Sequence, residues 1–161
     1  MVFVHPAVAN CCTALLPGVQ SGLLELLFDS TRTITSLLVS GTLARCADLR
    51  FIFSHGGGAL AQMAERIAAL NFQKALAPRF PKGVIYELKK LHLDITNMTS
   101  LASFEAVRDL VGIPNMLLGS DFPYGPVAAT TNGLARLNLG AADLRAIERD
   151  NALALLPQLR T

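Results

Sequence analysis

Four short apolar runs, each followed within a few residues by polar side chains, are the strongest pattern in this chain of 161 residues. They cover residues 2–4, 51–53, 91–95 and 116–118. Three of the four are continuous apolar runs, which are typical of strands buried on both faces of a parallel sheet. The run at residues 91–95 alternates instead, which places His92 and Asp94 on one face of its strand.

Apolar residues at helical spacing lie between and after these predicted strands. Asp29 or Ser30 is expected to cap a helix that fades near Cys46. Further helices are predicted over residues 59–76, 101–111 and 141–156, whereas residues 6–28 and 77–90 are expected to be loops. The alternation of strands and helices predicts an α/β fold with about four βα units.

Polar residues follow three of the predicted strands, and they are His5, His55 and Asp121. Ligand sites in parallel α/β folds lie beyond the carboxyl ends of the strands. Imidazole and carboxylate groups bind zinc and similar divalent ions, so a metal site at this edge is one interpretation. The three residues are far apart in the sequence and form no local metal-binding motif.

Each candidate also has an ordinary structural interpretation. His5 fits a hydrogen-bonded residue at a strand end, and Asp121 fits the cap of a turn. The glycines at residues 56–58 fit either a tight strand-to-helix turn or a close approach of the backbone to a ligand. His92 and Asp94 are expected to make ordinary buried hydrogen bonds.

The composition narrows the classes of protein to which the chain can belong. Hydrophobic residues make up 52% of the sequence and charged residues 16%, with a formal net charge of +2. This balance excludes a disordered chain and gives no electrostatic basis for binding nucleic acid or an acidic membrane. No apolar stretch is long enough to span a membrane, and three cysteines make no disulfide framework. We therefore expect one cytoplasmic domain over residues 1–161, with no nucleophilic role for Cys11 or Cys12.

The glycines after His55 match two other motifs incompletely. Residues 56–61 fit the dinucleotide-binding pattern G-x-G-x-x-A, but the next acidic strand end, Asp94, lies too far along the chain. The sequence His-Gly-Gly-Gly also occurs in the oxyanion loop of lipases, yet the chain has no G-x-S-x-G nucleophile turn.

Three segments together resemble a known family. They are Val-Phe-Val-His5-Pro6, Arg50-Phe-Ile-Phe-Ser-His55-Gly-Gly-Gly and Leu118-Gly-Ser-Asp121-Phe122-Pro123. In this order they are similar to the second half of the amidohydrolase-related (amidohydrolase 2) branch of the metal-dependent hydrolases. The similarity is to the aminocarboxymuconate-semialdehyde decarboxylase and 6-methylsalicylate decarboxylase types, and it covers nearly the whole chain.

This resemblance implies a TIM-type (β/α)₈ barrel of which the chain supplies the units of strands five to eight. It implies one divalent metal ion, often zinc, with His5 and Asp121 as ligands. His55 would be a catalytic acid/base, Asp121 would also move a proton, and Phe122 would contact the substrate. The implied activity is decarboxylation of a small aromatic or unsaturated carboxylic acid.

The chain also departs from the family pattern. It has three histidines and no H-x-H pair, which the family's first strand supplies as metal ligands. Because a complete barrel takes about 250 residues, we expect a homo-oligomer or a missing amino-terminal half to complete it. Two other functions stay open: hydrolysis of a lactone or amide by the same metal site, and a truncated, non-catalytic fragment that self-associates.

Overall fold

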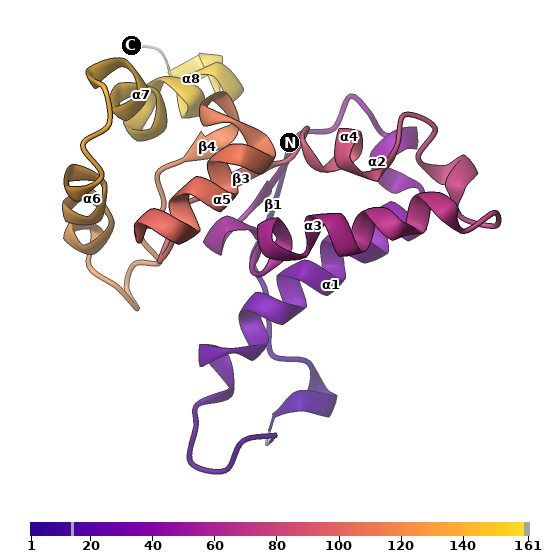
Figure 1. The fold of residues 1–161 in the computed structure, drawn as a ribbon. Helices are drawn as coiled ribbons and strands as arrows, with labels where there is room; N and C mark the ends of the chain where they lie inside the picture. Colours follow the sequence, from indigo (N-terminus) through magenta and orange to yellow (C-terminus); the bar gives the residue numbers. More distant parts are fainter. Residues whose placement is uncertain (14, 160–161) are drawn as a thin grey trace.

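The computed structural model describes residues 1–13 and 15–159, and its centre is a four-stranded parallel sheet (Figure 1). The strands are β1 (Val2–Val4), β2 (Phe51–Phe53), β3 (His92–Asp94) and β4 (Met116–Leu117), in that spatial order. The register pairs Val4 with Phe53, Phe53 with Leu93, and Asp94 with Leu117. This strand order is that of half a βα barrel, and it confirms the predicted α/β fold.

Eight α-helices are present in the described ranges. They are α1 (Glu25–Val39), α2 (Thr42–Arg45), α3 (Leu60–Ala68), α4 (Val84–Leu88), α5 (Leu101–Val111), α6 (Val127–Arg136), α7 (Ala141–Arg145) and α8 (Asn151–Leu155). Short 3₁₀ turns occur at Asn10–Cys12, Ser21–Leu23, His55–Gly57, Ala69–Phe72, Ala77–Arg79, Ile113–Asn115 and Pro157–Leu159, and a π turn occurs at Ala146–Asp150. Within the described residues no helix has the length and apolar character needed to cross a membrane.

The hydrophobic core lies between the sheet and the helices that connect its strands. Phe53 and Leu93 are fully buried, and they belong to one cluster with Ile34 of α1, Leu60 of α3 and Phe104 of α5. Helices α1 and α3 lie side by side over this part of the molecule (Figure 1). Because side chains alternate along a strand, Ile52 and Asp94 project from the opposite face of the sheet.

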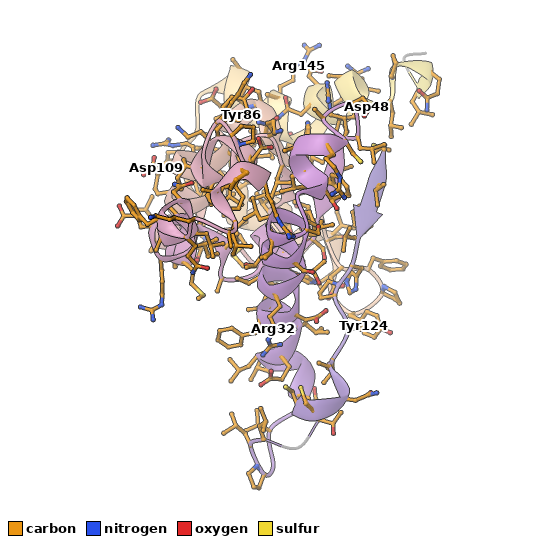
Figure 2. The ribbon with its side chains drawn as sticks, turned by 90° about the vertical axis from the view of Figure 1, so that its right-hand side faces the viewer. Arg32, Asp48, Tyr86, Asp109, Tyr124 and Arg145 are labelled. Atoms are coloured by element: carbon orange, nitrogen blue, oxygen red, sulfur yellow. The ribbon has the colours of Figure 1, made fainter. Side chains whose placement is uncertain are left out.

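That opposite face is only partly covered. Phe3 of the edge strand β1 is 59% exposed, and β1 lies at one margin of the molecule (Figure 2). An exposed apolar strand at a sheet edge is unusual in a complete domain and common where further strands pair. The face that would be the inside of a closed barrel is therefore open in this chain.

The first helix begins earlier than the sequence predicts. Its first residue is Glu25, so the expected cap at Asp29 or Ser30 is wrong. Ser30 and Thr31 are buried within α1, and the Thr31 hydroxyl accepts a hydrogen bond from the Ala59 backbone N–H at 3.0 Å. Thr31 therefore holds the turn after β2, whereas the buried Ser30 hydroxyl has no hydrogen-bond partner among the described residues.

Other boundaries differ in similar ways. The helix predicted over residues 59–76 ends at Ala68 and continues as a 3₁₀ turn, and the expected loop at 77–90 contains α4. The sequence pattern does not predict helix α6, because this helix contains two threonines, an asparagine and a glycine, all poor helix formers. By contrast, α5 is confirmed: the Ser100 hydroxyl accepts a hydrogen bond from the Ser103 backbone N–H at 3.3 Å.

Candidate metal centre

The structure brings His5, His55 and Asp121 together at the carboxyl edge of the sheet. Each residue offers one ligand atom, and these atoms all lie within 4.8 Å of one another. Asp121 Oδ1 is 3.6 Å from His5 Nε2 and 3.9 Å from His55 Nε2. The imidazole rings of His5 and His55 meet edge to face, with centroids 5.5 Å apart.

Three strands of the sheet, β1, β2 and β4, position these side chains. His5 follows β1 directly, His55 follows β2 after one residue, and Asp121 lies in the loop after β4. The backbone of His55 has φ +55° and that of Asp121 has φ +59°, in the left-handed region that side-chain-bearing residues seldom adopt. Such strained backbone is concentrated at functional sites, where the surrounding structure holds it in place.

A hydrogen bond fixes the ring of His5. Its Nδ1 lies 3.0 Å from the carbonyl oxygen of Pro6, and a carbonyl oxygen can only accept. The Nδ1 atom therefore carries the proton, and in the neutral imidazole the lone pair is on Nε2, which faces Asp121. This tautomer suits a metal ligand, because ligating imidazoles commonly donate their other N–H to a carbonyl or carboxylate group.

The cluster lies in the wall of an open cavity of about 560 Å³. His55 is buried, whereas the side chain of Asp121 is 26% exposed and that of His5 46% exposed, so solutes reach the ligand atoms. The other lining residues come from all four strand ends and from α8; they are Phe3, Ile52, Ser54, Asp94, Thr96, Leu117, Leu118, Gly119, Ser120, Phe122, Tyr124 and Ala152.

Two aromatic side chains stand at the mouth of this cavity. Phe122 is 75% exposed and Tyr124 is 90% exposed, so neither is a core residue. In Figure 2 Tyr124 lies at about mid-height, below the β1 arrow, and well away from Asp48, which precedes β2 and lies near the top. The aromatic residues therefore belong to the carboxyl edge of the sheet, as the cluster does.

Asp94 and Ser54 also line this cavity, although neither residue was assigned a functional role from the sequence. The Asp94 carboxylate accepts hydrogen bonds from the backbone N–H groups of His55 and Thr96. The hydroxyl oxygen of Ser54 is buried and has no hydrogen-bond partner in the part of the chain that the structure describes. The signal for Asp94 was present, since it is a carboxylate at a predicted strand end.

The remaining candidate residues lie elsewhere. His92 lines a second cavity, of about 460 Å³, beside Arg50 and Tyr86 near the amino ends of the strands. Burial, and secondarily the charge of Arg50, lowers the pKa of His92, and its Nδ1 atom has no partner among the described groups. The expected hydrogen bonding is therefore confirmed for Asp94 but not for that atom of His92.

Cys11 and Cys12 form a pair of thiols in the loop after β1. Their sulfur atoms are 2.8 Å apart, and the hydrogen bond between the two thiols, together with burial, raises the pKa of the Cys12 thiol. A raised pKa keeps the thiol protonated, which disfavours nucleophilic attack. That neither Cys11 nor Cys12 has a nucleophilic role stays a prediction.

The fold and the site together define a class of protein: half of a parallel βα barrel with two imidazoles and a carboxylate, groups that could hold a metal ion, at the carboxyl edge of its strands. A family model described as amidohydrolase matches residues 2–158. The chain therefore belongs to the amidohydrolase family, and this confirms the family resemblance of its sequence.

Known relatives and solved structures agree with this assignment. The chain is 28% identical over 173 residues to decarboxylase yanB from Aspergillus niger, covering 99% of this chain and 47% of the relative. It is 24% identical over 167 residues to a 6-methylsalicylic acid decarboxylase from Penicillium expansum, covering 99% of this chain and 51% of the relative. A dihydroxybenzoic acid decarboxylase from Polaromonas with bound manganese superposes with a TM-score of 0.82 at 17% identity, covering 99% of this chain and 50% of that one. The chain thus spans about half the length of the proteins that it matches.

Proposed function

We propose that this chain supplies the His5, His55 and Asp121 half of a metal-dependent decarboxylase site for a small aromatic carboxylic acid. The observation that carries the proposal is the convergence of two imidazoles and one carboxylate at the open carboxyl edge of the sheet. The decarboxylase names of the relatives support the reaction class, and the aromatic residues at the cavity mouth suit an aromatic substrate.

The residues present fit a divalent ion. Ligand atoms that each lie about 2.1 Å from one ion are roughly 3–3.5 Å apart, and the 3.6 Å between His5 Nε2 and Asp121 Oδ1 needs only a small inward movement. Mixed imidazole and carboxylate donors suit zinc, and they also suit manganese, which one structural neighbour contains. We propose His5 and Asp121 as ligands, with His55 beside them.

Each residue then has a distinct task. A bound divalent ion supplies positive charge that orients the carboxylate of the substrate. His55 is buried at the cavity floor, and it is placed to deliver a proton to the ring carbon while the carbon–carboxyl bond breaks and carbon dioxide leaves. Asp121 is within 4 Å of both imidazoles and is partly exposed, so it is placed to relay a proton from solvent to His55, which replaces the one proton consumed in each turnover. Phe122 contributes an apolar wall for the aromatic ring.

Half a barrel leaves the site open on one side. Phe3 is exposed on the β1 edge, and we propose that further strands complete the barrel, from a second copy of this chain or from a separate amino-terminal half. The assembly that carries the activity is therefore measured together with the activity, by sedimentation velocity at the assay concentration.

The test combines metal binding with turnover. Mn²⁺ or Zn²⁺ is expected to bind at one ion per chain, and His5→Ala and Asp121→Asn are expected to weaken binding at least tenfold. The control is Asp48→Asn, since Asp48 is exposed, precedes β2 and does not line the cavity of the cluster. Labelled carbon dioxide is then measured from carboxyl-labelled 6-methylsalicylate and 2,6-dihydroxybenzoate, where His55→Ala is expected to reduce turnover by about 10²–10⁴-fold.

The outcomes separate the competing functions. Carbon dioxide release that is lost in His55→Ala supports the decarboxylase. Hydrolysis of a lactone or amide without carbon dioxide release would instead assign the same residues to a hydrolase. A well-folded protein that binds no metal and turns over no substrate, in any assembly that it forms, contradicts both.

A further inference from the structure

The Asp94 carboxylate lies between the two strand ends that carry His55 and Asp121. Asp94 is the last residue of β3, which pairs with β2 on one side and β4 on the other. Its Oδ1 atom accepts hydrogen bonds from the backbone N–H of His55 at 2.9 Å and from that of Thr96 at 3.0 Å. All three residues are buried, so water does not compete readily for these bonds.

The same carboxylate packs against the end of β4. A Cβ atom added to Gly119 would lie 2.5 Å from Asp94 Cγ and 2.7 Å from Asp94 Oδ2. Only a residue without a side chain allows this approach, and Gly119 stands two residues before Asp121. The carboxylate thus contacts the backbone of both segments whose side chains meet in the cluster.

The conformation of His55 explains why such a contact is needed. Its φ of +55° is costly for a residue with a side chain, so surrounding contacts must offset that cost. A charge-assisted hydrogen bond from a buried carboxylate to the His55 N–H is a contact of that kind. This hydrogen bond fixes the backbone of His55, and the backbone conformation sets the direction in which the imidazole side chain projects.

We propose that Asp94 is a positioning residue, which holds the His55 backbone and the Gly119 segment so that the side chains of His55 and Asp121 lie within 3.9 Å of each other. Asp94 acts through the two residues and needs no contact with substrate or metal. The metal-binding test of this inference rests on the proposed function. The test of the hydrogen bond to His55 does not depend on it.

The first experiment uses the unaltered chain. In a ¹⁵N,¹³C-labelled sample, a scalar coupling across the hydrogen bond is expected between the amide nitrogen of His55 and the side-chain carboxyl carbon of Asp94. The amide hydrogen of His55 is also expected to exchange slowly. Absence of the coupling together with rapid exchange at that amide overturns the proposal, whether or not the protein binds a metal.

The second experiment uses matched variants. Asp94→Ala removes the oxygen that accepts both hydrogen bonds. We expect the His55 amide to exchange at least tenfold faster and Mn²⁺ to bind at least tenfold more weakly. Asp94→Asn keeps the side-chain oxygen, and it is expected to restore both measurements to within about threefold of wild type. Asp109→Ala, an exposed carboxylate on α5 (Figure 2), is the control and is expected to change neither.

The outcomes are distinguishable. A folded Asp94→Ala variant with wild-type exchange at His55 and wild-type Mn²⁺ affinity contradicts the positioning role. If wild-type protein binds no Mn²⁺, the proposed metal site fails, and the coupling and exchange data alone decide whether Asp94 holds His55. If Asp94→Ala does not fold, two measurements still test the proposal. They are the scalar coupling in the wild-type protein, and the His55 amide exchange and Mn²⁺ affinity of Asp94→Asn.

Discussion

The backbone carbonyl of Leu27 lies so close to Gly58 that a Cβ atom on Gly58 would stand 1.9 Å from the Leu27 oxygen. Gly58 also has φ +76° and ψ −123°, a combination that other residues avoid. The glycines after His55 therefore let α1 pack directly on the turn that carries His55.

We expect Gly58→Ala to destabilise the fold by about 2–5 kcal/mol, because it adds backbone strain and a clash with backbone. Gly22→Ala is the control, since its Cβ would meet only the Leu26 side chain, at 3.6 Å or more. Urea unfolding of the two variants measures the difference. Equal stabilities would show that α1 does not pack on this turn as described.

Asn151 connects α8 to the start of β4. Its side-chain amide donates to the carbonyl oxygens of Ile113 at 2.7 Å and Met116 at 2.8 Å. Asn151→Ala is expected to cost about 1–3 kcal/mol, because two carbonyl groups lose their donor. Asn151→Asp is expected to cost more, since a carboxylate would then face the two carbonyl oxygens. Thermal unfolding tests this order, and Asn132→Ala on the exposed side of α6 is expected to change little.

His92 makes the stability depend on pH. Burial and the nearby Arg50 lower its pKa, so the folded protein binds this proton less readily than the unfolded chain does. Above a pH of about 6.5, the ordinary histidine pKa, His92 is neutral in both states and has no effect. As the pH falls below that value, the unfolded chain takes up the proton first, and the free energy of unfolding decreases until the lowered pKa of the folded state is passed.

The measurement is the free energy of unfolding of wild type and His92→Gln between pH 8 and pH 5. The wild type is expected to lose more stability than the variant across this range, at no more than about 1.4 kcal/mol per pH unit for one group. Parallel curves for the two proteins would mean that His92 titrates as it does in the unfolded chain.

A substitution of Phe122 is expected to change the affinity for substrate without changing the stability of the fold. Because its side chain is 75% exposed, Phe122→Ala is expected to change the free energy of unfolding by less than about 0.5 kcal/mol. Loss of its contact with an aromatic ring is expected to weaken binding of 2,6-dihydroxybenzoate by about two- to tenfold. Calorimetry measures the affinity, with Phe72→Ala, 88% exposed, as the control. Unchanged affinity would remove Phe122 from the substrate site.

Much of the fold followed from local patterns. The four strands and the helix capped by Ser100 were predicted because strand alternation, continuous apolar runs and capping residues act over a few neighbouring positions. The placement of His5, His55 and Asp121 at strand ends was visible for the same reason. Their chemical roles stay predictions, because the sequence and geometry show proximity and donor type rather than reaction.

The tertiary structure decided what depends on contacts between distant segments. The distances within the cluster, the part played by Asp94 and the need for glycine at position 58 arise where β2, β3, β4 and α1 meet. The predicted cap at Asp29 or Ser30 was wrong because α1 begins at Glu25, and the neighbouring Thr31 hydrogen-bonds to Ala59, 28 residues away. Local patterning sets which residues form each element, whereas packing between elements sets which side chains meet, and only folded coordinates contain the second.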